Sequence, residues 1–104
     1  MAKMVVIYKT PKDSVAFEKH YFEVHVPLAK KLPGLKSYEA SRGSVIKVAG
    51  DWIPYLVATL YFDDLDSIKK AFASPEGKAC AADRKILAPN ESDLQMYLFD
   101  DRLL

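Results

Sequence analysis

Three short stretches of the sequence are largely apolar and bounded by turn residues, which is typical of strands. They are Met4–Tyr8, Tyr55–Phe62 and Leu94–Phe99. A fourth stretch, from Leu35 to Val48, looks extended but alternates less regularly, and Gly43 within it suits a bulge or bend. The pattern therefore predicts four strands.

Between the first two strands, apolar residues recur at the spacing of one helical face. They are Phe17, Tyr21, Val24, Leu28 and Leu32. Asp13 or Ser14 can cap this helix. Two further helices are expected after the third strand, one running through Phe72 and one from Pro75 to Leu87, with proline in the first helical position.

Pro27 interrupts the first helical pattern. Proline has no N–H to donate to the carbonyl of Glu23, and its ring disfavours a helical conformation at Val26. We therefore expect the helix to end at His25 and a short second turn to run from Pro27 to Pro33-Gly34. In that position, a helix dipole would favour the protonated form of His25.

The predicted order is strand, helix, strand, strand, helix, strand. That is the ferredoxin-like βαββαβ arrangement, an α+β fold whose antiparallel sheet carries its helices on one face. The chain of 104 residues is long enough for one domain, spanning residues 1–104, and too short for two.

The first and third strands are apolar on both faces. In an antiparallel sheet with one solvent-exposed face, polar and apolar residues should instead alternate along each strand. The helices can cover only one face, so the other needs a partner. A second copy packed about a two-fold axis is the economical answer. Burying roughly six side chains per protomer would contribute ~10–20 kcal/mol before association costs. A third layer supplied by an unrelated partner is the alternative.

Composition narrows the function classes. The net charge of +1 gives no indication of a nucleic-acid or acidic-membrane partner. The sequence has no signal-peptide pattern, and its first apolar run is too short to cross a bilayer, so a cytoplasmic location is expected. The single cysteine, Cys80, cannot form an internal disulfide and is expected to be a small buried helix residue rather than a nucleophile.

Several segments together resemble the signature of the EthD family. They are Tyr21-Phe22, His25-Val26-Pro27-Leu28-Ala29, Leu32-Pro33-Gly34-Leu35 with Tyr38, Leu60-Tyr61-Phe62-Asp63 and Ala73-Ser74-Pro75-Glu76-Gly77. The resemblance covers most of the chain, in order, and implies a dimeric α/β barrel of the ferredoxin-like kind. The family's namesake is an accessory protein of ether degradation. Similar proteins include polyketide-tailoring decarboxylases and cyclases, and the wider superfamily adds small monooxygenases, lactone isomerases and haem enzymes. These chemistries use different residues on one scaffold, so the fold alone does not choose between them.

His25 is the first candidate for chemistry, as a general acid or base at the gap between helices and sheet. A structural histidine that tethers the Pro27 turn is the alternative. Tyr38 and Tyr61 are expected to reach a cavity and polarise a carbonyl there. The expected substrate-binding residues are aromatic: Tyr21, Phe22, Trp52, Tyr55 and Phe62.

His20 lies off the apolar stripe and is expected to be exposed. The two histidines are five residues apart, and no carboxylate stands at a spacing that would complete a site, so metal binding is not expected.

Three functional hypotheses remain. The first is a homodimer that binds or acts on a small hydrophobic, aromatic compound by cofactor-free proton transfer, as a cyclase, decarboxylase, isomerase or monooxygenase. The second is a non-catalytic accessory or carrier protein for the oxygenase of a degradation pathway. The third is haem binding through His25.

Overall fold

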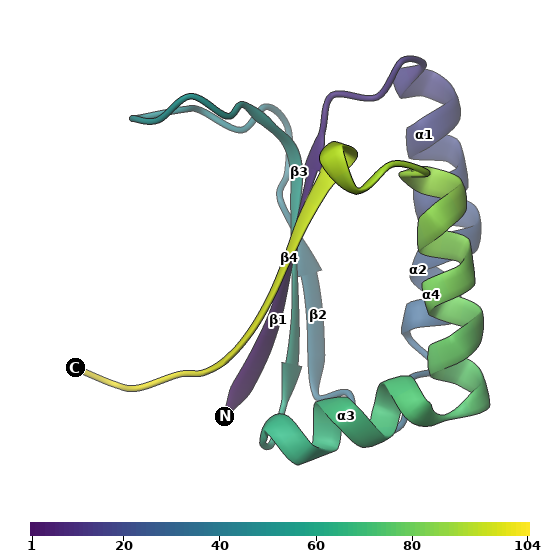
Figure 1. Cartoon of the computed structure of the whole chain (residues 1–104), viewed down its shortest axis with the longest axis vertical. Coiled ribbons are helices and arrows are strands. Elements are labelled where there is room, and N and C mark those ends of the chain that lie inside the picture. Colours follow the sequence, from purple (N-terminus) through teal and green to yellow (C-terminus); the bar gives the residue numbers. More distant parts are fainter.

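A four-stranded antiparallel sheet forms one layer of the computed structural model, which describes residues 1–104. Its strands are β1 (Ala2–Lys9), β2 (Ser37–Ala40), β3 (Pro54–Phe62) and β4 (Leu94–Asp100), in the spatial order β2-β3-β1-β4. All the helices lie on one face of this sheet (Figure 1). The predicted ferredoxin-like α+β fold is thereby confirmed.

The helix after β1 does not break at His25, contrary to the prediction. Helix α1 (Ser14–His20) continues through a π-helical turn, η1 (Tyr21–His25), into α2 (Val26–Ala29). The backbone N–H of Val26 donates to the carbonyl of Tyr21, five residues back, and Val26 itself is helical. This wide turn admits one extra residue, and we attribute the tolerance of Pro27 to it, since the ring no longer meets a regular preceding turn.

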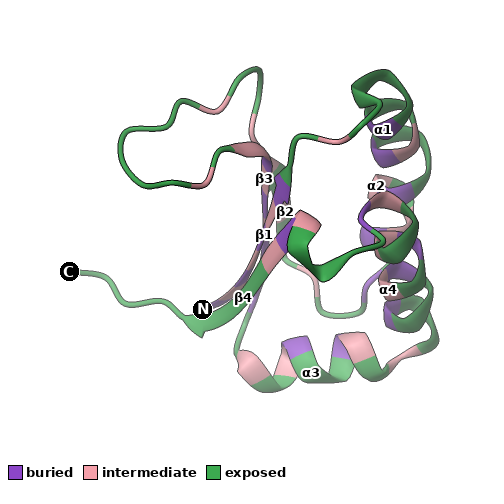
Figure 2. Ribbon diagram, turned by 45° about the horizontal axis from the view of Figure 1, so that its top comes forward, coloured by how far each residue is buried: buried purple, intermediate pink, exposed green.

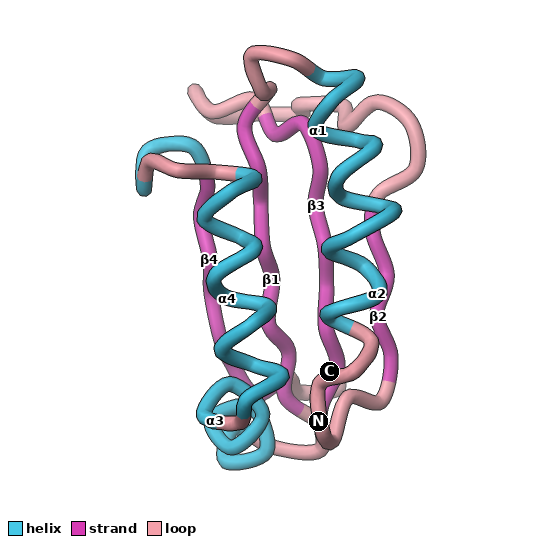
Figure 3. Tube along the Cα trace, turned by 90° about the vertical axis from the view of Figure 1, so that its right-hand side faces the viewer, coloured by secondary structure: helices cyan, strands magenta, loops and turns pink.

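Two helices complete the second layer. Helix α3 (Leu65–Ala73) is capped by Asp64, whose carboxylate accepts a hydrogen bond from the Ser67 amide at 2.7 Å. Helix α4 (Pro75–Leu87) has the predicted bounds, and a short 3₁₀ turn, η2 (Glu91–Asp93), precedes β4. Helix α4 lies on the β4 side of the sheet and the α1–η1–α2 helix on the β2 side, as Figure 3 shows.

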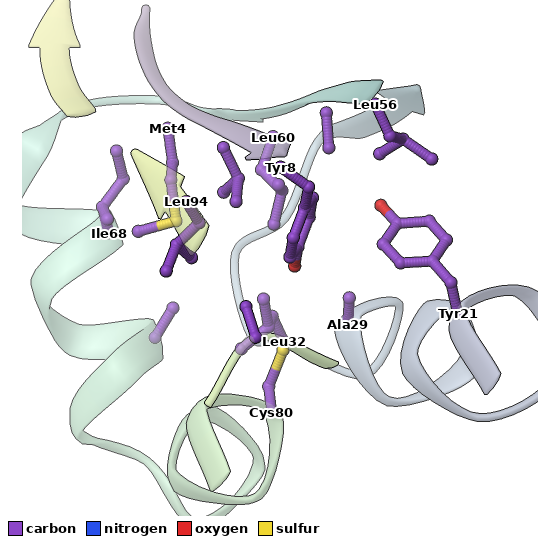
Figure 4. Close-up of a cluster of buried hydrophobic side chains, with 14 of the residues drawn as sticks. Met4, Tyr8, Tyr21, Ala29, Leu32, Leu56, Leu60, Ile68, Cys80 and Leu94 are labelled. Atoms are coloured by element: carbon purple, nitrogen blue, oxygen red, sulfur yellow. The ribbon is translucent and has the colours of Figure 1, made fainter. Parts of the chain in front are cut away.

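The sheet has an inner face against the helices and an outer face away from them. Inner-face residues of β1 and β3, together with residues from the helices, build the core: Met4, Val6 and Tyr8 from β1, and Leu56, Ala58, Leu60 and Phe62 from β3. Buried residues accordingly concentrate along the strands and on the helix sides that face them (Figure 2). Figure 4 shows Tyr8 reaching from the sheet toward the space between Cys80 and Ala29.

The outer face carries the alternate residues of the same strands and is covered by no element of the chain. Its apolar side chains are Val5, Ile7, Val57, Tyr61, Tyr97 and Phe99. No helix combines the length and apolarity needed to cross a membrane.

The second strand is much shorter than the predicted extended stretch 35–48. Pairing of β2 with β3 ends near Ser41, whose amide donates to the carbonyl of Val57, and residues 41–53 form a long loop. Beyond that point no neighbouring strand supplies hydrogen-bond partners, and positive φ angles at Gly43 (71°) and Gly50 (101°) turn the chain. The loop and the C-terminal tail both project on the side of the sheet away from the helices (Figure 1).

Candidate functional site

A cavity of about 100 Å³ lies between the inner face of the sheet and the helices. Apart from His25 and Arg84, its lining is aliphatic, aromatic or sulfur-containing: Met4, Val6, Tyr8, Tyr21, Ala29, Tyr38, Ala58, Leu60, Phe72, Cys80, Ala81 and Met96. An apolar cavity with a few converging polar groups is the usual form of a small-molecule site.

His25 enters this cavity from the last residue of the π turn and is only 6% exposed. Its Nδ1 lies 2.9 Å from Oδ2 of Asp83, and its Nε2 lies 4.0 Å from the sulfur of Cys80. An ionised carboxylate only accepts hydrogen bonds, so we assign the ring proton to Nδ1. The neutral ring then presents the lone pair of Nε2 on the Cys80 side, where the cavity lies.

The pKa of His25 is lowered from its ordinary value, chiefly because burial disfavours the charged ring. The hydrogen bond and the negative charge of Asp83 act in the opposite direction and offset part of this effect. His25 lies inside the helix rather than at its end. The prediction that a helix dipole stabilises its protonated form was therefore wrong. The buried imidazole is thus a neutral base at pH 7.

Asp83 joins the two histidines and was missed by the sequence analysis. It is 6% exposed, and its other oxygen, Oδ1, lies 2.7 Å from Nε2 of His20. The prediction that His20 is solvent-exposed was therefore wrong: its side chain is 29% exposed and paired. One signal could have found Asp83, since it shares the helical stripe of Cys80 and Leu87, where a carboxylate is unexpected unless it has a partner.

Two tyrosine hydroxyls meet at the side of the cavity. The hydroxyl oxygens of Tyr21 and Tyr38 are 2.5 Å apart, and the ring of Tyr21 stacks on His25 with centroids 5.4 Å apart. The π turn places Tyr21 and His25 on the same side of the helix, and β2 supplies Tyr38.

Burial raises the pKa of Tyr38 to about 12 and raises the pKa values of Tyr21 and Tyr8 further. All three hydroxyls therefore remain protonated at neutral pH, and each has a proton that it can donate. Burial likewise raises the pKa of the Cys80 thiol to about 11, and Cys80 is a buried helix residue as predicted. The lining of this cavity thus holds one neutral base and several neutral donors.

Tyr61 does not reach the cavity, contrary to the prediction. It lies between two inner-face residues, Leu60 and Phe62, and therefore points to the outer face. There its hydroxyl donates to the carboxylate of Glu39, and the ammonium of Lys3 lies 5.2 Å from its ring centroid.

Phe22 and Tyr55 also lie outside the cavity lining. Phe22 is exposed and contacts the edge of Tyr21, with ring centroids 5.2 Å apart. The pairing of β3 with β1 skips Tyr55, and the resulting bulge brings its ring against Phe17, with centroids 5.7 Å apart.

Trp52 and Phe62 complete the predicted aromatic set, and neither lines the cavity. Trp52 lies in the long loop, with the ammonium of Lys9 5.5 Å from its ring centroid. Phe62 is fully buried at the end of β3, close to Gly34. Of the predicted site residues, the structure brings together His25, Tyr21 and Tyr38.

Comparisons with known proteins agree with this architecture. The family model of the EthD domain matches residues 9–88. An uncharacterised 11.0 kDa protein from the thcB–thcC intergenic region of Rhodococcus erythropolis is 37% identical over 86 residues, which are 80% of each chain. The crystal structure of an ethyl tert-butyl ether degradation (EthD) family protein from Bacillus halodurans is 33% identical, with a TM-score of 0.86 over 98% of this chain and 99% of that one.

More distant structures share the fold. SnoaB, a cofactor-independent oxygenase from Streptomyces nogalater, is 18% identical with a TM-score of 0.68, over 99% of this chain and 94% of its own. A dimeric protein of unknown function with a ferredoxin-like fold, from Bacteroides fragilis, is 20% identical with a TM-score of 0.65, over 96% and 95% of the two chains.

Proposed function

This chain belongs to the EthD family, and from that premise we propose that it acts on a small hydrophobic compound by acid–base chemistry that needs no cofactor. The observation that carries the proposal is the buried pairing of His25 with Asp83 beside an apolar cavity. A structural tether would need only the bond between Nδ1 and Asp83, whereas Nε2 of the neutral ring faces the cavity, where its only neighbour within hydrogen-bond distance is the weakly donating thiol of Cys80.

In this proposal, Nε2 of His25 removes a proton from a carbon next to a carbonyl group of the bound compound. A ring that is neutral at the working pH can accept this proton. Asp83 holds the ring in the required tautomer and stabilises the imidazolium that forms, as the carboxylate of a catalytic triad does. His20 holds the second oxygen of Asp83 and so fixes the carboxylate in place. Asp83 and His20 are positioning residues.

Tyr21 and Tyr38 would stabilise the negative charge that develops on the carbonyl oxygen. In a pair of hydroxyls, one donates to the other and the second proton remains available. Pre-positioned donors at a developing oxyanion act most strongly where water is excluded. Cyclisation, isomerisation and decarboxylation all pass through such an enolate, and monooxygenation of an electron-rich ring would add dioxygen as the co-substrate.

The protein would act as a homodimer. The outer face carries six apolar side chains and has no cover within the chain, while loop 41–53 and the C-terminal tail extend on the same side (Figure 1). The ferredoxin-like protein from Bacteroides fragilis is dimeric. A second copy would cover the outer face and leave each cavity within one chain.

Two other functions remain as alternatives. A carrier or accessory protein needs the apolar cavity but not the base. Haem ligation by His25 is the hypothesis least compatible with the geometry, because pockets for ligands of drug size occupy roughly 300 Å³ or more and this cavity has about 100 Å³.

Cleavage of 5-nitrobenzisoxazole tests the proposal without knowledge of the natural substrate. A base removes the single proton from C3 of this compound, the N–O bond breaks, and a coloured cyanophenolate forms. We expect the wild-type protein to accelerate the reaction, and His25→Gln to lower the rate by about 100-fold or more. Asp83→Asn should also shift the pH midpoint of the rate downward, because the charge of Asp83 supports the protonated form of His25.

Tyr38→Phe and Tyr61→Phe form a matched pair for the same assay. Each removes one hydroxyl, but only Tyr38 lines the cavity. We expect a loss of about tenfold for Tyr38→Phe and no change for Tyr61→Phe. Equal rates for the wild-type protein and His25→Gln would refute the acid–base proposal, and tight binding without cleavage would favour the carrier function.

A further inference from the structure

Arg84 is the only side chain in the cavity lining that carries a permanent positive charge. It follows Asp83 on α4 and is partly exposed. No ion pair and no side-chain hydrogen bond involves its guanidinium, and the neighbouring carboxylate of Asp83 is bound to the two histidines. The other ion pairs and side-chain hydrogen bonds join other residues.

The helical position of Arg84 indicates where the cavity opens. Successive residues of a helix are turned by roughly 100°, so Asp83 and Arg84 point to different sides of α4. Asp83 faces the α1–η1–α2 helix, and Arg84 therefore lies toward the β4 side, together with Ala81. Met96 of β4 also lines the cavity and is 40% exposed. The partial exposure of Ala81, Arg84 and Met96 indicates that the cavity opens to solvent at this edge between α4 and β4.

The positive charge of Arg84 at this opening has no negatively charged partner in the cavity lining. No carboxylate lines it, and its walls are apolar, so a guanidinium there lacks a counter-ion in a partly desolvated position. Burial is the main cause of the lowered pKa of His25, and the positive charge of Arg84 contributes in the same direction, which places the guanidinium within electrostatic reach of the base. Guanidinium groups bind carboxylates through two parallel hydrogen bonds.

We propose that the natural ligand of this cavity is a small apolar carboxylate, whose carboxylate pairs with Arg84 at the opening and whose apolar body lies toward His25 and the tyrosine pair. This inference deepens the proposed function and uses the same cavity. At the opening the carboxylate keeps part of its hydration, which limits the cost of binding a charge. An engineered cavity of about 150 Å³ in another protein accepts benzene, so the enclosed space of about 100 Å³ suits a body of about one ring, and the rest of a larger compound, such as the second ring of 5-nitrobenzisoxazole, would extend through the opening.

Benzoate and benzamide provide matched probes, since they share a shape and differ in charge. Their dissociation constants can be measured by following the amide resonances of the ¹⁵N-labelled protein. We expect the wild-type protein to bind benzoate about 10- to 100-fold more tightly than benzamide. Arg84→Gln should abolish this preference and leave the affinity for benzamide unchanged.

Lys85→Gln is the matched control, because it removes the same charge from the next residue of α4, which is exposed and lies outside the cavity lining. It should retain the preference for benzoate. Equal affinities of the wild-type protein for the two probes, or a preference that survives Arg84→Gln, would overturn the inference.

The outcome is separable from that of the proposed function. If benzoate is not preferred but cleavage of 5-nitrobenzisoxazole still depends on His25, only the carboxylate inference fails. If the preference depends on Arg84 but cleavage does not depend on His25, only the acid–base proposal fails.

Discussion

Gly77 occupies a position where helix propensity and packing predict opposite effects of substitution by alanine. It lies in the first turn of α4, and its amide donates to the hydroxyl of Ser74 at 3.1 Å. In a helix, replacing glycine by alanine is favourable by up to about 1 kcal/mol. A methyl group on Gly77 would, however, lie 2.8 Å from the carbonyl carbon of Phe72, and closer still to the Cα of Phe72 and the carbonyl oxygen of Ala71.

Packing should decide the sign of the effect. Overfilling a packed site costs about 1–3 kcal/mol even where a side chain can move aside. Here the obstructing atoms belong to the backbone at the corner between α3 and α4, so relief requires a shift of one helix against the other. We therefore expect Gly77→Ala to destabilise the protein by about 2 kcal/mol or more, which for a chain of this size lowers Tm by about 8–16 °C.

Urea and thermal unfolding, followed by circular dichroism at one fixed protein concentration, measure this effect. Ala79→Gly is the control, because Ala79 is exposed on the same helix and its substitution should cost only the propensity difference of about 1 kcal/mol. A Gly77→Ala protein as stable as the wild type would refute the reasoning. Because α4 also carries Cys80, Asp83 and Arg84, a destabilised variant should show altered ligand binding as well.

Two further predictions concern pH and assembly. Burial lowers the pKa of His25 below its ordinary 6.5, so the unfolded chain takes up this proton first on acidification. The contribution of neutral His25 to the free energy of unfolding is therefore complete above about pH 6.5. It is lost as the pH falls through the folded-state pKa of His25, by at most about 1.4 kcal/mol per pH unit. Urea midpoints between about pH 7.5 and 5 should show this slope, and parallel curves for the wild type and His25→Gln would contradict it. Val57→Asp, which places a carboxylate opposite Ile7 on the outer face, should convert a dimer to a monomer in light scattering because burying an unpaired charge costs several kcal/mol. The same change at the exposed Val15 of α1 should leave the dimer intact, and a dimeric Val57→Asp protein would refute the interface.

Most of the fold can be predicted from local patterns in the sequence. Helix α4 begins with a serine cap and a proline, and its predicted bounds agree with the structure. The strand pattern gave the order of elements and hence the topology. Tyr61 was misplaced for a specific reason: both faces of β3 are apolar, so alternation separates the two sets of residues without indicating which set faces the helices.

The site depended on contacts that no local pattern contains. The π turn accommodates Pro27 within one continuous helix, whereas helix propensity alone predicts a break there. Asp83 is 58 residues from His25 and 63 from His20. A carboxylate on an apolar helical stripe indicates that a partner exists, but only the packing of α4 beside the first helix identifies it.

Apart from the bulge at Tyr55, the strands carry two interleaved sets of side chains, with even-numbered residues toward the helices and odd-numbered residues outward. Substitutions in one set can therefore change what the interior accommodates without altering the external surface, and the reverse also holds. An engineer could redesign ligand choice and self-association separately by restricting each library to a single parity. During evolution, the inward-facing and outward-facing residues could likewise change independently of each other.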